Sequence, residues 1–235
     1  MALILNIETA TDTCSVALAL NENVLAFHEE TGTKMHASLL TQFIEAVVAE
    51  TGNSYHNLDA IAVSKGPGSY TGLRIGVSVA KGLCFALDKP LISVNTLQAY
   101  TTYFIEYLFN NLSFGNEGQP SFCPMIDARR MEVYTALFDC NSQFLEETQA
   151  IILDENSFSE TLKNQKVVFF GNGATKWLPL ALTHKNAVVV KDSPTSARGM
   201  VKWALSQFQK KNFENVAYFE PYYLKDFVST QHQRK

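Results

Sequence analysis

The sequence lacks the patterns that define several common classes of protein. Its four cysteines are widely spaced and form no CxxC pair, which argues against a zinc-finger site, so we expect reduced thiols that are mostly buried. It has no HExxH, GxSxG or GxxxxGK[ST] motif, the short patterns of zinc proteases, α/β-hydrolases and P-loop nucleotidases. No run approaches the roughly 20 consecutive apolar residues of a membrane-spanning helix. We therefore expect a cytoplasmic globular protein that does not associate with a membrane.

Basic residues are also too few to give the chain an overall positive charge. The 235 residues include 19 Lys and Arg against 23 Asp and Glu, for a net charge of -4. Affinity for a nucleic-acid backbone comes mainly from clustered Lys and Arg. The overall charge therefore argues against a dedicated nucleic-acid surface, and we expect any contact with a nucleic acid to be indirect, through a partner protein.

Two successive units with the same order of strands and helices are predicted. In the first, three strands precede alternating helices and strands, at residues 3–7, 14–20, 24–30, 36–50 (helix), 60–64, 71–87 (helix), 91–94 and 96–109 (helix). In the second, the pattern recurs at residues 122–127, 132–139, 145–152, 155–164 (helix), 166–170 and in a helix after Gly173. This order predicts an α/β protein with two mixed-sheet subdomains.

The boundaries of these units follow from local composition. We expect an N-terminal subdomain over residues 1–109, a polar, turn-rich linker over 110–120 and a C-terminal subdomain over 121–225. The segment 195–208 has the spacing of an amphipathic helix and is expected to pack back on the first subdomain. Residues 226–235 are polar and are expected to form a frayed tail.

The segment Lys65–Gly76 reads KGPGSYTGLRIG and joins a predicted buried strand to an apolar helix. Ser69 and Thr71 are suited to cap that helix. The segment matches no nucleotide-binding fingerprint, so a tight strand-to-helix connection is favoured over a phosphate loop. Gly72, Gly76 and Ala80 lie four residues apart on one stripe of the helix, where small side chains would let a second helix approach closely.

These residues resemble the TsaB (YeaZ) family, bacterial proteins of tRNA threonylcarbamoyladenosine (t6A) biosynthesis. Further matches cover about residues 1 to 225: the opening LILNIETATDTCSVAL, HASLL from His36, MIDARRMEVY over Met125–Tyr134 and EPYYLK over Glu220–Lys225. The match over residues 65–83 is the most specific. The resemblance implies the duplicated actin/hexokinase/Hsp70-like (ASKHA) fold, in agreement with the two repeated units.

The resemblance also implies a function for the protein within an assembly. We expect a non-catalytic scaffold that pairs with TsaD for threonylcarbamoyl transfer to N6 of adenosine 37 in tRNAs reading A-starting codons, with TsaC and TsaE as functional partners. The helices 36–50 and 71–87 are expected to form the interface, and to form a homodimer when the protein is alone. The alternative is that both helices serve only the internal core. The candidate interface residues are Leu39, Leu40, Phe43, Val47, Gly72, Gly76, Val79, Ala80 and Leu83.

The alternative function is an ATP-binding kinase or ATPase of the same fold, in which one polar turn from each subdomain grips phosphate. The residues that could form a vestigial nucleotide site are Glu8, Thr9, Thr11, Asp127, Gly171 and Gly173. TsaB proteins usually carry Asp where this sequence has Glu8. Arg129 and Arg130 stand near Asp127, where a nucleotide-binding turn would have glycine for close backbone approach. We therefore expect no cofactor, with a weak or composite ATP or ADP site left open.

A metal-dependent activity is not expected. The related catalytic protein TsaD holds a metal with two histidines one helical turn apart, whereas His36 is followed four residues later by Leu40. One helical histidine is too few ligands for a tight metal site. The sequence therefore predicts no metal and no catalytic residue, and hence no activity of the protein alone.

Overall fold

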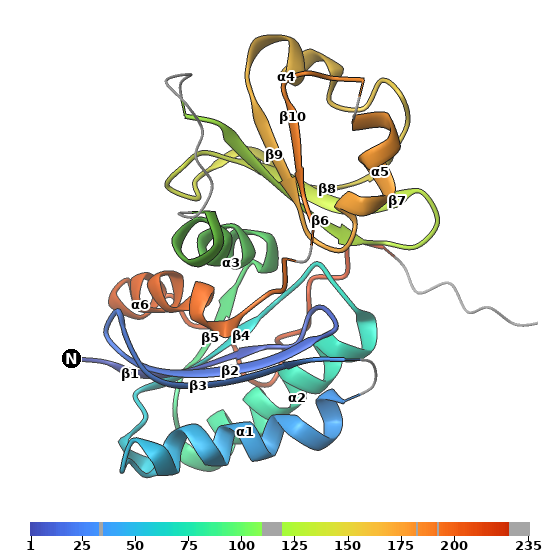
Figure 1. Cartoon of the computed structure of the whole chain (residues 1–235). Coiled ribbons are helices and arrows are strands. Elements are labelled where there is room, and N and C mark those ends of the chain that lie inside the picture. The colour runs from blue at the N-terminus through green and yellow to red at the C-terminus, as the bar shows by residue number, and fades with distance from the viewer. Residues whose placement is uncertain (33–34, 110–118, 182, 192, 226–235) are drawn as a thin grey trace, which may run out of the picture.

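The computed structural model describes residues 1–235 except 33–34, 110–118, 182, 192 and 226–235. Most of the predicted linker and the whole predicted tail therefore lie outside the described residues. Figure 1 shows two lobes, each built on a sheet. No helix in the described part of the chain is long and apolar enough to cross a membrane. All four cysteines are free thiols, and burial raises the pKa of Cys123 to about 12.

The N-terminal lobe contains a five-stranded mixed sheet in the order β3-β2-β1-β4-β5. Its strands are β1 (Leu3–Glu8), β2 (Thr13–Leu20), β3 (Asn23–Thr31), β4 (Ala60–Ser64) and β5 (Leu91–Val94). The central strand β1 pairs antiparallel with β2 and parallel with β4, and all six of its residues are buried. The helices α1 (His36–Glu50) and α2 (Tyr70–Leu87) cover one face of the sheet (Figure 1).

The C-terminal lobe repeats this arrangement strand for strand. Its strands are β6 (Ser121–Asp127), β7 (Glu132–Phe138), β8 (Phe144–Ile152), β9 (Val167–Phe170) and β10 (Ala187–Val190). The order β8-β7-β6-β9-β10 places each strand where its counterpart five strands earlier lies in the first sheet. The helices α4 (Ser159–Asn164) and α5 (Ala174–Ala181) correspond to α1 and α2. The predicted duplicated α/β fold is confirmed.

Two helices lie between the sheets (Figure 1). The helix α3 (Thr96–Tyr103) continues into a π-helical turn, Phe104–Leu108, and buries Phe104 against Phe170 of the second sheet, with ring centroids 3.9 Å apart. The helix α6 (Val201–Gln209), after a 3-10 turn at Ala197–Met200, packs on the first sheet. The C-terminal lobe therefore buries part of a helical segment from the N-terminal half of the chain, and the N-terminal lobe buries part of a helix from the C-terminal half.

The sequence prediction missed or misplaced some of these elements. The strand β10 was not predicted, because its four half-buried residues form a short edge strand with little alternation. The helix expected from residue 195 begins as a 3-10 turn at Ala197, where the Ser196 hydroxyl accepts a hydrogen bond from the Arg198 backbone N–H. The helix expected over 96–109 ends as an α-helix at Tyr103 and continues as the π-helical turn.

The chain returns across the molecule after α6. Residues 212–225, called here the C-terminal strap, first bind the N-terminal lobe, where the Glu214 N–H donates to Leu91 O at 2.9 Å. Further along, the Tyr222 N–H donates to Lys65 O at 2.7 Å. Lys225 then reaches the second lobe and pairs with the carboxylate of Glu132. The C-terminal strap therefore joins the two lobes on one side of the molecule.

Candidate functional sites

The first turn of the chain, between β1 and β2, is closed by a buried carboxyl group. Glu8 is 1% exposed, and its Oε1 accepts hydrogen bonds from the Ala10 N–H at 2.6 Å and the Ser64 hydroxyl at 3.1 Å. Burial raises the pKa of Glu8 from 4.5 to about 7. The side chain supports the turn from beneath and does not line the cavity described below.

The glycines of α2 pack against this turn. The Thr9 hydroxyl donates to Gly72 O at 2.8 Å. A Cβ atom at Gly72 would lie 2.1 Å from Thr9 O, and one at Gly76 would lie 2.2 Å from Thr9 Oγ1. Such distances are far inside van der Waals contact, so both positions require glycine. The first turn of the same chain therefore packs against Gly72 and Gly76. This finding corrects the expectation that these glycines let a helix of a partner approach closely.

Apart from Gly72 and Gly76, the candidate interface residues divide into two groups. Leu40, Val47 and Ala80 are fully buried in the core of the N-terminal lobe. Leu39, Phe43, Val79 and Leu83 are partly buried and pack against that same core. The first group is therefore inaccessible to a partner, whereas the second group is partly exposed, as expected where an apolar stripe first covers its own sheet.

A different part of α2 faces outward. Phe85 is 86% exposed, and a Cβ atom at Gly82 would meet no other atom within 4 Å. Ser78 and Ala86 are also exposed. We call Ser78, Gly82, Phe85 and Ala86 the outer α2 face. Phe85 was not identified from the sequence, although its spacing of three from Gly82 places the two on one side of a helix.

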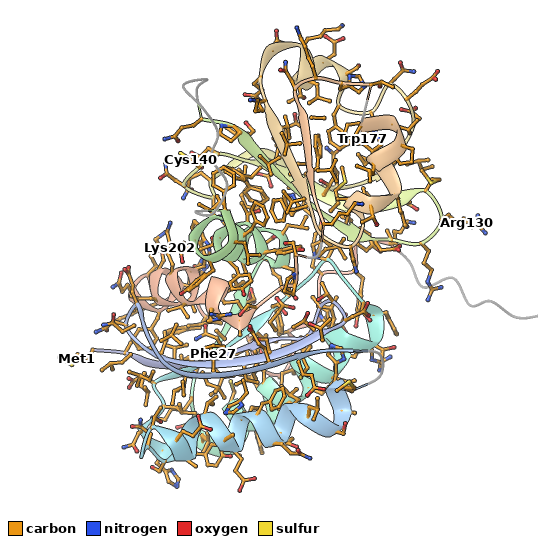
Figure 2. The ribbon with its side chains drawn as sticks, in the orientation of Figure 1. Met1, Phe27, Arg130, Cys140, Trp177 and Lys202 are labelled. Atoms are coloured by element: carbon orange, nitrogen blue, oxygen red, sulfur yellow. The ribbon has the colours of Figure 1, made fainter. Side chains whose placement is uncertain are left out.

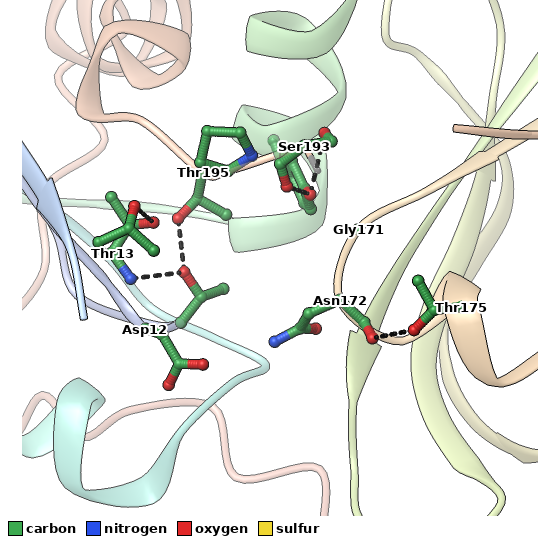
Figure 3. A pocket seen from close by; sticks show the side chains of 11 residues that line it. Asp12, Thr13, Gly171, Asn172, Thr175, Ser193 and Thr195 are labelled. Carbon is green, nitrogen blue, oxygen red and sulfur yellow. Dashed lines mark hydrogen bonds between the residues drawn. The ribbon is translucent and has the colours of Figure 1, made fainter. Parts of the chain in front are cut away.

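A cavity of about 460 Å³ opens between the lobes (Figure 3). It is lined by Thr11, Asp12, Thr13, Thr31, Tyr100, Gly171, Asn172, Thr175, Ser193, Pro194 and Thr195. The Thr11 and Thr195 hydroxyls are hydrogen-bonded at 2.6 Å, and Tyr100 donates to the backbone oxygen of Ser193. Burial raises the pKa of Tyr100, so its hydroxyl keeps its proton.

The polar groups of this cavity are mainly hydroxyls. Asp12 supplies the one carboxylate among the described lining residues, which include no Lys or Arg. Hydroxyls and the Asn172 amide can hydrogen-bond a small polar molecule, but they do not offset the several negative charges of a nucleotide triphosphate.

Only some of the expected nucleotide-site residues meet at the cavity. Thr11 and Gly171 line it, whereas Thr9 is buried against α2. Asp127 lies outside and forms an ion pair with Lys176 at 2.6 Å. Gly173 donates its N–H to Met125 O at 2.9 Å and also lies outside the lining. Asn172 also lines the cavity and was not predicted. Its position between Gly171 and Gly173, in a predicted strand-to-helix turn, could have identified it from the sequence.

His36 and Leu40, the two positions compared with the metal-binding histidines of TsaD, both have structural roles. His36 Nε2 lies 2.9 Å from the backbone oxygen of Thr11, and Leu40, one helical turn later, is fully buried. In the described ranges, no three His, Cys, Asp or Glu side chains lie close enough together to hold a metal ion. His36 therefore helps to hold the start of α1 against the first turn.

We expect the free energy of unfolding to decrease as the pH rises from about 5 to 7, because of Glu8. Between 4.5 and about 7, the folded state keeps a proton that the unfolded state has released, which costs up to about 1.4 kcal/mol per pH unit. Glu8→Gln stays neutral and should lose this part of the pH dependence. Urea unfolding of both proteins at several pH values measures the difference, and parallel curves would contradict the pKa assignment.

Two lobes with the same strand order, and a cavity between them bordered by one turn from each, define a protein of the actin/hexokinase/Hsp70 class. A family model described as "TsaD: tRNA N6-adenosine threonylcarbamoyltransferase" matches residues 26–228. The tRNA threonylcarbamoyladenosine biosynthesis protein TsaB of Escherichia coli (strain K12) is 29% identical over 234 residues, covering 96% of each chain. TsaB of Bacillus subtilis (strain 168) is 31% identical over 175 residues, 72% of this chain and 70% of that protein.

A solved structure shows the same fold. YeaZ from Pseudomonas aeruginosa superposes with a TM-score of 0.74 at 24% identity, over 95% of this chain and 100% of that chain. The chain belongs to the TsaB (YeaZ) family of tRNA threonylcarbamoyladenosine biosynthesis proteins.

Proposed function

We propose that this chain acts in t6A biosynthesis as a non-catalytic scaffold that pairs with TsaD. The pair supports the transfer of threonylcarbamoyl to N6 of adenosine 37 in tRNAs that read A-starting codons, with TsaC and TsaE as functional partners. The observation that carries this proposal is the outer α2 face, where Phe85 is 86% exposed beside the open Gly82.

The chemistry of this face fits another helix. A large exposed aromatic ring beside glycine, alanine and serine gives a ridge next to a groove, which is how two helices interlock. An exposed aromatic side chain in such a setting is typical of a protein contact. TsaD is expected to carry an equivalent helix, because a TsaD family model matches residues 26–228 of this chain. Equivalent helices of two related chains can then pack together about a pseudo-twofold axis.

The same face would pair two copies of this chain when TsaD is absent. The outer α2 face is then shielded in a homodimer, and TsaD competes for it. ATP or ADP is proposed to bind this chain only weakly, or at a site that a partner completes, since the lining of the interlobe cavity carries Asp12 and no cation among its described residues.

Sedimentation of the isolated protein and of its mixture with TsaD tests the pairing. At tens of micromolar we expect a homodimer, because a specific interface of about 1,000 Å² or more is stable at that concentration. An equimolar amount of TsaD should convert the homodimer to a heterodimer, because TsaD competes for the same face. A protein that stays monomeric and does not sediment with TsaD would contradict the proposal.

A further inference from the structure

A surface rich in tyrosine and basic side chains lies where the C-terminal strap crosses from one lobe to the other. We call it the junction patch, and it consists of Tyr70, Arg74, Arg129, Arg130, Tyr223 and Lys225. All six residues are exposed. They come from the start of α2, the turn between β6 and β7 and the end of the C-terminal strap, which are far apart in the sequence.

Ring stacking, ion pairing and backbone hydrogen bonds join these residues into one surface. The rings of Tyr70 and Tyr223 have centroids 5.0 Å apart, and the Arg74 guanidinium lies 5.3 Å from the centroid of Tyr70. Two residues after Tyr223, Lys225 pairs with the carboxylate of Glu132. Glu132 in turn donates its N–H to Arg129 O at 3.1 Å. The patch therefore runs without a break from α2 to the turn of the second lobe.

The local charge is opposite to that of the whole chain. Two acids beside the patch are paired, Asp127 with Lys176 and Glu132 with Lys225. A third, Glu220, lies near Tyr223 and offsets one of the three cations Arg74, Arg129 and Arg130, so the surface keeps a positive charge. Among the described residues, Arg129 and Arg130 form no salt bridge. Their guanidinium groups are therefore available to an anionic partner. The net charge of -4 hides this concentration of positive charge.

The backbone of the turn gives a second reason to regard the arginines as functional. Arg129 and Arg130 have φ angles of 70° and 49°, in the left-handed region where glycine is least strained. Figure 2 shows Arg130 pointing away from the second lobe. Exposed cations that form no ion pair with the described residues, held in a conformation that glycine would adopt more readily, indicate a role outside the fold.

We infer that the junction patch binds tRNA directly. Guanidinium and ammonium groups contact phosphates, and exposed tyrosine rings stack on unpaired bases. The inference rests on the proposed function, because the patch begins at the start of α2, whose outer face is proposed to meet TsaD. A tRNA held by the catalytic partner would thus extend onto this chain. This surface replaces the expectation, drawn from overall charge, that tRNA contact is only indirect.

The variant Arg129→Gly with Arg130→Gly removes both cations at positions whose backbone favours glycine, so the fold should be kept. We expect the complex with TsaD to bind an unmodified transcript of a tRNA reading an A-starting codon roughly ten- to fiftyfold more weakly at 0.1 M salt. The slope of log K against log salt should fall by roughly 1.4 to 1.8, as for two lost phosphate contacts. Lys211→Gly is the matched control, since Lys211 is an exposed cation with φ 54° that follows α6.

The stacking contribution is tested separately with Tyr223→Ala. Loss of one stacked base should weaken binding of the same transcript roughly five- to hundredfold, with little change in the salt slope. Tyr218→Ala is the control, because Tyr218 is 84% exposed on the same strap and lies outside the junction patch. Tyr218→Ala should leave the affinity unchanged.

Pairing with TsaD is measured on every variant by sedimentation. Failure of the proposed pairing can then be distinguished from failure of the proposed tRNA contact. If wild-type protein does not pair with TsaD, the proposed function fails, and the transcript is then titrated against this chain alone. Intact pairing with unchanged transcript affinity in both patch variants would overturn the tRNA inference. Unchanged transcript affinity together with weakened TsaD pairing would overturn it too, and would assign the patch to a protein contact.

Discussion

Gly82→Arg should leave the protein folded and prevent its pairing with TsaD. The Cβ of a new side chain at this position meets no atom of its own chain within 4 Å. In the proposed complex, however, the arginine would fill the groove beside Phe85 and carry a charge into a closely packed interface. We expect the affinity for TsaD to fall at least about a hundredfold, as for a disrupted interface hot spot. Circular dichroism and sedimentation with TsaD measure the two effects.

The matched control places the same residue on a helix that faces elsewhere. Gln209→Arg lies at the exposed end of α6, which packs on the opposite face of the N-terminal sheet from α1 and α2 (Figure 1). It should be folded and should pair normally. Normal pairing by a folded Gly82→Arg protein would place the interface away from the outer α2 face.

Gly76→Leu should strongly destabilise the protein. The added Cβ alone would lie 2.2 Å from Thr9 Oγ1, so the first turn or α2 must move. Overpacking costs about 3 kcal/mol, loss of the Thr9 to Gly72 hydrogen bond adds about 1 kcal/mol, and better helix propensity returns about 1 kcal/mol. The net loss of about 3 kcal/mol is a large part of the stability of a typical domain.

Urea unfolding of Gly76→Leu beside Gly82→Leu isolates the steric cause. Both variants make the same replacement within α2, but Gly82 is open to solvent. Gly82→Leu should be as stable as wild type or up to about 1 kcal/mol more stable, from helix propensity alone. Equal unfolding midpoints for the two variants would show that Gly76 does not pack against Thr9.

The sequence predicted the architecture because hydrophobic periodicity is local. Buried runs such as Ala60–Ser64 and the apolar stripe of α2 could be assigned from residue spacing alone. The repetition of three strands followed by alternating helices and strands then gave the duplicated fold. The edge strand Ala187–Val190 was missed because four half-buried residues carry little periodic signal.

The orientation of α2 could not be obtained in this way. Spacing shows that Gly72, Gly76 and Ala80 share a stripe, but it does not show which neighbour that stripe meets. The neighbour is Thr9, more than sixty residues earlier in the chain. The junction patch was missed for the same reason, because Arg74, Arg129 and Lys225 are brought together only by the path of the C-terminal strap.

The central claim is that this chain supports catalysis by TsaD through pairing, without chemistry of its own. It is tested most directly by t6A formation on an unmodified tRNA transcript with TsaD, TsaC, TsaE, threonine, bicarbonate and ATP, with and without this chain. We expect modification only when the chain is present, with Gly82→Arg as inactive as its omission and with no modification by the chain without TsaD. Full modification in the absence of this chain, or modification by this chain in the absence of TsaD, would contradict the account.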